Sequence, residues 1–291
     1  MAPQAIPLPL AVLVRFAHAA AQATAAAHGL DLLHVKGSAL DSRLATGRGS
    51  GTDADVWVRP SQSEQFLHAL RDEGWLVFTT FRSGSPFGHA ATYRHTHFGY
   101  LDVHRLFPGI TVDPELAFDA MWSRRDTIDI AEWECAVPDF IDQSLLLLLH
   151  AARGEGNLRA DDDVARAWTT ATPEEQQLIR QRADELAAQV ALAAAIGELD
   201  RHTGDRNYPL WRTYSRGGTK LDQWRARVQA APNRREAARM ILRAPLVNLD
   251  HLAISLGHRP SRAEVLAAYR ARGARLVRDL GTKRRRPKDS P

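Results

Sequence analysis

The feature that most constrains this chain is a short run, DADVWV at residues 53–58, which joins a strand pattern to two carboxylates. Side chains alternate between the two faces of a strand, so Asp53, Asp55 and Trp57 share one face and the apolar residues between them share the other. Two carboxylates on one face repel each other, and Mg²⁺ relieves such repulsion because it binds a few carboxylates together with substrate phosphates. The run therefore predicts a strand with one face in the core and a metal site on the other.

A third carboxylate, Asp102, stands in a later strand pattern, YLDVHRLF. His104 follows two residues later and is expected on the same face by the same alternation. Mg²⁺ prefers oxygen ligands, so His104 is better suited to orient Asp102 or to contact an acceptor than to bind the metal. A zinc site at His89, His95 and His97 is the weaker alternative, because no cysteine accompanies these histidines.

A tight turn precedes the acidic strand. The apolar run LLHV breaks into Lys36, Gly37 and Ser38, and a glycine-rich stretch around Arg48 leads on to the carboxylates. Backbone N–H groups at such a turn favour anions, and glycine lets a phosphate approach the backbone closely. Lys36 and Arg48 would neutralise phosphate charge; pairing of Arg48 with Asp41 in a loop is the alternative.

In this order, the motifs resemble the nucleotidyltransferase superfamily of the DNA polymerase beta type. In detail they resemble a group of bacterial proteins known as uncharacterised nucleotidyltransferases. The segment FIDQSLLLLLHAARG also resembles that group, and the resemblance covers roughly residues 30 to 165. The matching elements are Lys36-Gly37, Arg48, Asp53-Ala54-Asp55 and Asp102-Val103-His104.

The resemblance implies an enzyme that moves a nucleoside monophosphate from an NTP, such as ATP, to an acceptor and releases pyrophosphate. It implies Mg²⁺ or Mn²⁺ as the cofactor. Asp53, Asp55 and Asp102 would be both the catalytic residues and the metal ligands. Without the flanking motifs, Asp53 would be a turn residue and Asp55 a solvated strand residue. The nucleotide would be bound by Lys36, Gly37, Ser38, Arg48 and His104.

The pattern of elements predicts an α+β fold. Residues 1–138 are expected to form a nucleotidyltransferase domain with a small mixed sheet, residues 139–280 an all-helical domain, and residues 281–291 a basic disordered tail. Strands are predicted within 32–36, 53–58, 75–78, 89–95, 100–107 and 128–137. Helices are predicted at 8–28, 38–45, 61–72, 114–122, 139–152, 161–170, 173–199, 219–231, 234–242 and 262–280, with a loop over 204–218.

Charge and cysteine content limit the partners and the compartment. The isoelectric point is about 9.5, but the segment from Lys283 holds five of the 38 basic residues and one of the 34 acidic ones, which leaves 33 of each elsewhere. Nucleic acid is therefore a possible but not a favoured partner. The lone Cys135 excludes an internal disulfide and fits the cytoplasm. No apolar run predicts a membrane partner, and the N-terminal stretch lacks the basic start of a signal peptide.

We therefore expect an acceptor that is a small-molecule hydroxyl or a protein side chain. Two alternatives stay open: a toxin-like transferase that acts on tRNA or protein, and a non-catalytic protein that only binds nucleotides. The sequence does not specify the acceptor, the nucleobase, the oligomeric state, or the role of the C-terminal helices and the tail.

Overall fold

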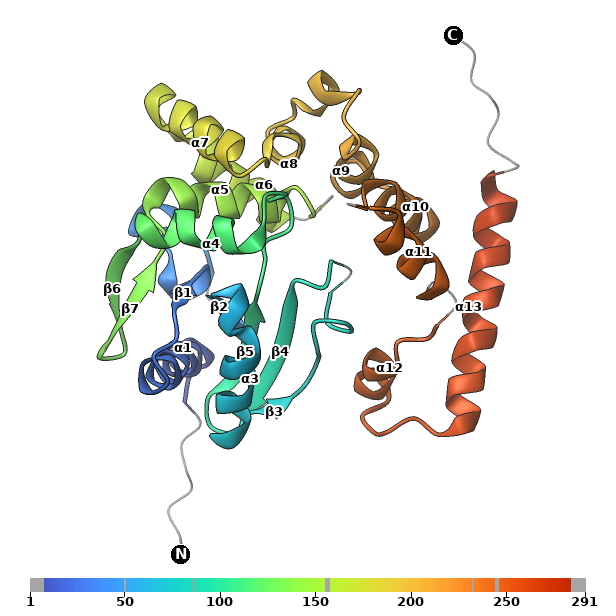
Figure 1. Cartoon of the computed structure of the whole chain (residues 1–291), viewed down its shortest axis with the longest axis horizontal. Helices are drawn as coiled ribbons and strands as arrows, with labels where there is room; N and C mark the ends of the chain where they lie inside the picture. Colours follow the sequence, from blue (N-terminus) through green and yellow to red (C-terminus); the bar gives the residue numbers. More distant parts are fainter. Residues whose placement is uncertain are drawn as a thin grey trace, which may run out of the picture.

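The computed structural model describes residues 8–49, 51–85, 87–154, 158–231, 233–243 and 246–283. It has the predicted α+β architecture: a mixed sheet in the first half of the chain is followed by helices that extend away from it (Figure 1). No strand occurs among the described residues after Val137.

The sheet has five strands in the order β1-β2-β5-β4-β3. β2 and β5 pair in parallel, and the other neighbours pair antiparallel. The parallel register sets Asp55 opposite Asp102. The strand bounds are Leu32–His34 (β1), Asp53–Val58 (β2), Leu76–Val77 (β3), Ala90–His95 (β4) and Gly99–His104 (β5), and a separate ribbon pairs β6 (Asp126–Ile130) with β7 (Trp133–Val137).

Helices cover both faces of the sheet. α1 (Leu10–Ala27) and α3 (Ser63–Asp72) share a core with Ala54, Val56 and Val58 of β2. Trp57 faces the opposite core, with α4 (Pro114–Ser123) and α5 (Phe140–Ala151). The predicted alternation along β2 is therefore confirmed, and it places the two acids on the same side as α5.

By length and composition, α1 is a helix that could cross a membrane. In this fold its inner side packs on the sheet, where Val14, Ala17 and Ala21 belong to the core that contains β2. The apolar residues of α1 thus form part of the core beneath the sheet.

Eight helices follow α5 within the described residues: α6 (Leu158–Val164), α7 (Pro173–Glu185), α8 (Gln189–Ala195), α9 (Tyr208–Ser215), α10 (Lys220–Ala230), α11 (Arg234–Arg243), α12 (Leu249–Leu256) and α13 (Arg262–Lys283). One apolar core joins Trp57 and Phe107 of the sheet region to Leu147, Ile179 and Trp211 of the helices. Because this core crosses residue 138, the division into two domains stays a prediction. Helix α13 continues past residue 281, and residues 284–291 of the predicted tail lie outside the described residues.

The predicted helix over 38–45 is wrong. The chain forms a single 3-10 turn, Gly37–Ala39, and then a short helix α2, Ser42–Ala45. Asp41 separates the two, because its carboxylate accepts a hydrogen bond from the backbone N–H of Arg43 at 2.8 Å and caps α2. A regular helix therefore does not begin at the Gly-Ser turn.

Two predictions in the C-terminal half also need correction. The region 173–199 is two helices, because Ala187 adopts a left-handed φ of 47° between α7 and α8. The predicted loop over 204–218 contains α9, which starts with Pro209 in its first turn and buries Leu210 and Trp211.

A buried histidine pair ties α1 to β1. Nδ1 of His18 lies 2.9 Å from Nδ1 of His34, whose Nε2 lies 3.0 Å from Oε1 of Gln22. The amide oxygen accepts from Nε2 of His34, so Nδ1 of neutral His34 accepts from His18. Burial lowers the pKa of both rings, that of His18 to about 4.

We expect the free energy of unfolding to fall as the pH drops below about 6.5. The unfolded chain binds protons there, while the folded pair stays neutral; stability is therefore complete above the unfolded pKa and is lost toward pH 4. His18 alone accounts for about 3 kcal/mol by pH 4, at ~1.4 kcal/mol per pH unit. Urea unfolding at several pH values measures this, with His18→Asn to flatten the profile and exposed His68→Gln as the control. An unchanged profile for His18→Asn would contradict it.

Candidate active site

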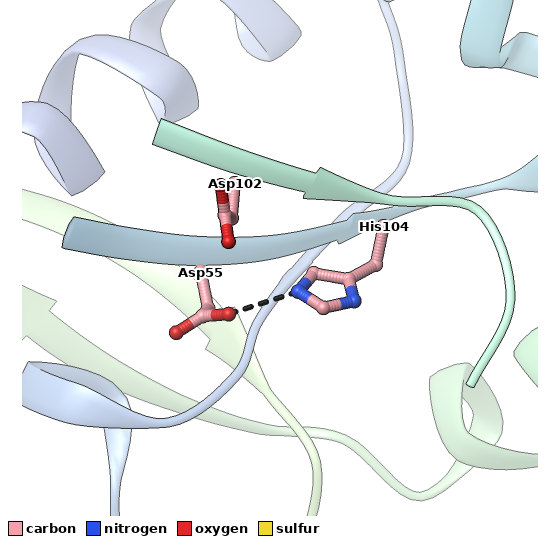
Figure 2. Close-up of side chains that lie close together, drawn as sticks. All are labelled: Asp55, Asp102 and His104. Atoms are coloured by element: carbon pink, nitrogen blue, oxygen red, sulfur yellow. Dashed lines mark hydrogen bonds and ion pairs between the residues drawn. The ribbon is translucent and has the colours of Figure 1, made fainter. Parts of the chain in front are cut away.

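Asp55, Asp102 and His104 form a compact cluster on adjacent strands. Each offers one ligand atom, and these atoms lie within 4.8 Å of one another. Figure 2 shows the carboxylate of Asp102 beside Asp55, with the His104 ring turned toward Asp55. The parallel pairing of β2 with β5 produces this arrangement, because it aligns Asp55 with Asp102 and Trp57 with His104.

Lys36 completes the cluster from the turn after β1. Its Nζ lies 2.8 Å from Oδ1 of Asp55, and Nε2 of His104 lies 2.8 Å from the same oxygen. Lys36 has a positive φ of 65°. Such a backbone conformation is unfavourable for a residue other than glycine, and strained residues of this kind are concentrated at functional sites. Lys36, which was predicted to bind phosphate, thus forms an ion pair with the carboxylate of Asp55 in this structure.

The carboxylates differ in their affinity for protons. Burial opposes ionisation of Asp55, but Lys36 and the hydrogen bond from His104 hold its pKa well below the ordinary value. Burial and the charge of Asp55 raise the pKa of Asp102 to about 7, although Thr92 Oγ1 donates a hydrogen bond to it at 2.6 Å. Burial and Asp55 also raise the pKa of Asp53. Asp53 and Asp102 therefore hold a proton more readily than an ordinary aspartate, whereas Asp55 stays ionised.

Asp53 lies on the same face of β2 but outside the compact cluster. It pairs in register with Tyr100 rather than with an acid, and Thr52 Oγ1 lies 3.3 Å from its Oδ1. The charge of Asp55 nevertheless acts on its pKa. The three predicted acids therefore share one side of the sheet, with two of them in direct proximity.

His104 is neutral and oriented. Burial lowers its pKa, although the bond to Asp55 acts in the opposite direction. Nε2 donates to Asp55, which leaves Nδ1 as an acceptor; that atom is buried and has no partner among the described residues. His104 therefore orients Asp55 rather than Asp102.

The Gly-Ser turn borders a pocket of about 200 Å³. It is lined by Gly37, Ser38, Leu40, Ala45, Arg48 and Gly49. The volume exceeds what a phosphate group needs and is below the range for whole small-molecule ligands. Three residues predicted to bind the nucleotide thus meet at one pocket.

Arg48 has a partner that neither sequence alternative named. Its Nε and Nη2 donate to the two carboxylate oxygens of Asp163, at 2.8 and 3.2 Å, and both side chains are almost fully buried. This bidentate ion pair connects the glycine-rich loop to α6. The DDD run at 161–163 was the available signal, but helical periodicity alone does not say which acid turns inward.

Arg153, just after α5, is a cation near the cluster that the sequence prediction missed. Nη1 lies 3.4 Å from Nε2 of His89, whose Nδ1 is hydrogen-bonded to Ser85. Nε of Arg153 is buried and has no hydrogen-bond partner among the described residues. Burial lowers the pKa of Arg153 to about 10, while the charge of Asp55 acts to raise it. A buried guanidinium with no carboxylate partner among the residues that the structure describes is suited to bind an anion.

Aromatic rings border Arg153. Its Cζ lies 6.0 Å from the centre of the Phe87 ring, which packs against Tyr214 of α9 at 5.2 Å. The His89 ring lies 5.3 Å from that of His104. The helices after α5 therefore contribute directly to the surroundings of the acidic cluster.

The residues fit a hard divalent cation. The donors include carboxylate oxygens, which Mg²⁺ and Mn²⁺ prefer. Burial and the negative charge of Asp55 raise the pKa of Asp102, and a bound cation would offset that negative charge. Among the described residues, His89, His95 and His97 do not form a second group of three metal ligands. The carboxylate-rich site is the better metal candidate.

Comparison with solved structures finds low similarity to several nucleotidyltransferases. Lincomycin-bound lincosamide antibiotic adenylyltransferase LnuA is 15% identical, with 57% of this chain and 90% of that chain covered and a TM-score of 0.32. The antibiotic-resistance factor ANT(2'')-Ia is 14% identical, with 67% and 93% covered and a TM-score of 0.36. An antigenic nucleotidyltransferase-like protein from Paracoccidioides brasiliensis is 14% identical, with 66% and 100% covered and a TM-score of 0.36.

No curated protein matches this chain. A family described as "Uncharacterised nucleotidyltransferase" matches residues 17–202, well over half of the chain, and the matched segment contains the three acids, Lys36, the Gly-Ser turn, Arg48, His104 and Arg153. The chain therefore belongs to this uncharacterised nucleotidyltransferase family.

Proposed function

We propose that this enzyme transfers a nucleoside monophosphate from an NTP to a hydroxyl of a small molecule or a protein side chain, with Mg²⁺ or Mn²⁺ as cofactor. The observation that carries the proposal is the pair Asp55 and Asp102 on adjacent parallel strands, on the sheet that also positions the Gly37-Ser38 pocket. The acceptor oxygen attacks the α-phosphorus, the bond to the bridging oxygen of the β-phosphate breaks, and pyrophosphate leaves.

Asp53, Asp55 and Asp102 would hold the metal. When bound, the metal neutralises phosphate charge and lowers the pKa of the attacking hydroxyl. Asp102 would bind the metal near the attacking hydroxyl and act as the base or orient it. His104 and Lys36 fix the orientation of Asp55 by two bonds to one oxygen.

The phosphates would lie between two groups of donors. The backbone of Gly37 and the hydroxyl of Ser38 border the pocket, and Lys36 is the cation that immediately precedes them. Arg153 supplies a second positive charge from the helical side, near His104 and Asp55. Positioning and charge neutralisation supply most of the catalysis in phosphoryl transfer. Backbone N–H groups, a hydroxyl and two cations are the kinds of group that such catalysis needs.

Two other functions differ in measurable ways. A toxin-like enzyme would label tRNA or protein, and a non-catalytic protein would bind NTP without releasing pyrophosphate. The three acids on one side of the sheet favour catalysis over binding alone. The cytoplasmic location stays a prediction from the lone buried Cys135.

Replacement of Asp53 or Asp102 is expected to abolish nucleotide transfer. With α-³²P-labelled NTPs, Mg²⁺ and a panel of candidate acceptors, Asp53→Ala and Asp102→Asn should each lose more than the ~10–100-fold that removal of outer-shell partners costs. Exposed Asp72→Asn is the matched control and should keep full activity. Equal labelling by wild type and both site variants would refute the proposal.

Arg153→Met is expected to weaken binding of the metal–NTP complex about tenfold or more, because a hydrogen bond to a charged group contributes ~1.5–3 kcal/mol. Arg153→Lys should recover part of the loss, since it keeps the charge but not the fork. Calorimetry with Mg²⁺ and ATP measures both, with exposed Arg125→Met as the control. Unchanged ATP affinity in Arg153→Met would remove this residue from the nucleotide site.

A further inference from the structure

The charges of this chain are separated along the sequence. Residues 1–200 contain 16 basic and 27 acidic residues, a formal net charge of −11, whereas residues 201–291 contain 22 basic and 7 acidic residues, a net charge of +15. The family match ends at residue 202, where the sign of the charge changes. The overall charge of +4 conceals this separation. Such an asymmetry between halves indicates a polyanionic partner for the basic half.

The basic half ends in an extended helical arm, defined here as α11, α12 and α13. Figure 1 shows the arm at the side of the molecule away from β6 and β7. None of its residues belongs to the described apolar cores. Its apolar side chains are instead exposed: Leu242 is 75% exposed, Leu266 52% and Tyr269 40%. Packing within the described chain therefore does not account for this surface.

Several arginines of the arm have no counter-ion within the described part of the chain. Arg234 and Arg235 in the first turn of α11, and Arg262 and Arg270 of α13, are exposed and form no ion pair with any residue that the structure describes. Arginine dominates the basic half, with 19 of its 22 basic residues. Its planar fork binds phosphate with two hydrogen bonds and stacks on unpaired bases, which lysine does not do.

The placement of the arginines on α13 argues against a membrane surface as the partner of that helix. A helix that lies in a membrane interface separates a charged face from an apolar one. Arg270 and Arg272 of α13 are two residues apart and so lie on nearly opposite sides of a helix with 3.6 residues per turn. A flexible polyanion can reach both sides, whereas a flat surface cannot.

We propose that the C-terminal arm binds single-stranded RNA. Arginines would contact the phosphates, and the exposed Tyr269 and leucines would contact unpaired bases, as in proteins that combine a basic surface with stacking side chains. Asn248, just before α12, donates a hydrogen bond at 2.9 Å to the backbone oxygen of Ser83, in the loop that leads to His89. The segment before α12 thus contacts the loop that precedes β4. The proposed RNA binding requires neither metal nor NTP.

The test uses the full-length protein and a fluorescent 20-nucleotide single-stranded RNA of mixed sequence, without metal or nucleotide. The arm variant carries Arg234→Glu, Arg235→Glu and Arg270→Glu. The control variant makes the same change of charge in the catalytic half, with Arg15→Glu, Arg94→Glu and Arg125→Glu, all exposed. Circular dichroism verifies that both variants are folded. Affinity is measured at several salt concentrations.

We expect wild type to bind the RNA, with log affinity falling linearly with log salt concentration. The arm variant should bind at least tenfold more weakly, and the control variant should stay within about threefold of wild type. Three results would overturn the proposal: no RNA binding at low salt, equal losses in both variants, or equal or tighter binding of single-stranded DNA of the same sequence. Binding to phosphatidylserine vesicles in place of RNA would identify a membrane surface instead. Loss of transfer activity in Asp53→Ala has no bearing on this test.

Discussion

Repulsion between Asp55 and Asp102 is the constraint on which the rest of the site depends. Parallel pairing of β2 with β5 sets the two carboxylates side by side in a partly buried position. The fold reduces the repulsion unequally: Lys36 and His104 both contact Asp55, whereas within the described part of the chain Asp102 has only the hydroxyl of Thr92 as a side-chain hydrogen-bond partner. Burial and the nearby charge of Asp55 raise the pKa of Asp102. An unevenly compensated pair of acids is a preformed site for a cation, held in place by backbone pairing that does not depend on the cation.

Backbone geometry and side-chain charge have separate tasks here. The sheet and its two cores fix where each acid lies, because Trp57 and Val56 anchor opposite faces of β2 in separate apolar clusters. The loops and helices then supply positive charge from outside the sheet, through Lys36 after β1 and Arg153 after α5. The acidic strand could therefore be kept rigid while the approach for substrate is formed by the surrounding segments.

Local patterns were sufficient to predict the sheet side of the site. The alternation in DADVWV predicted which residues of β2 share a face, and the spacing of Asp102 and His104 predicted that both lie on one face of a later strand. The pairing of that strand with β2 is known only from the structure. Such patterns could not predict the partners of Arg48 and Arg153. Arg48 pairs with Asp163, which is 115 residues away in the sequence, and Arg153 lies beside His89, which is 64 residues away. The helix expected after the Gly-Ser turn failed for a local reason, since Asp41 caps a later start.

Charge separation imposes a further requirement on the molecule. The first 200 residues have a net charge of −11, which disfavours polyanions at long range, whereas the metal that we propose at Asp55 and Asp102 would attract a triphosphate locally. Any large anionic partner must therefore be captured by a different surface with the opposite sign. The arm has that sign and lies outside the described apolar cores, and Asn248, just before α12, contacts the loop before His89. Short-range attraction at the site and long-range attraction at the arm are thus assigned to different parts of one chain.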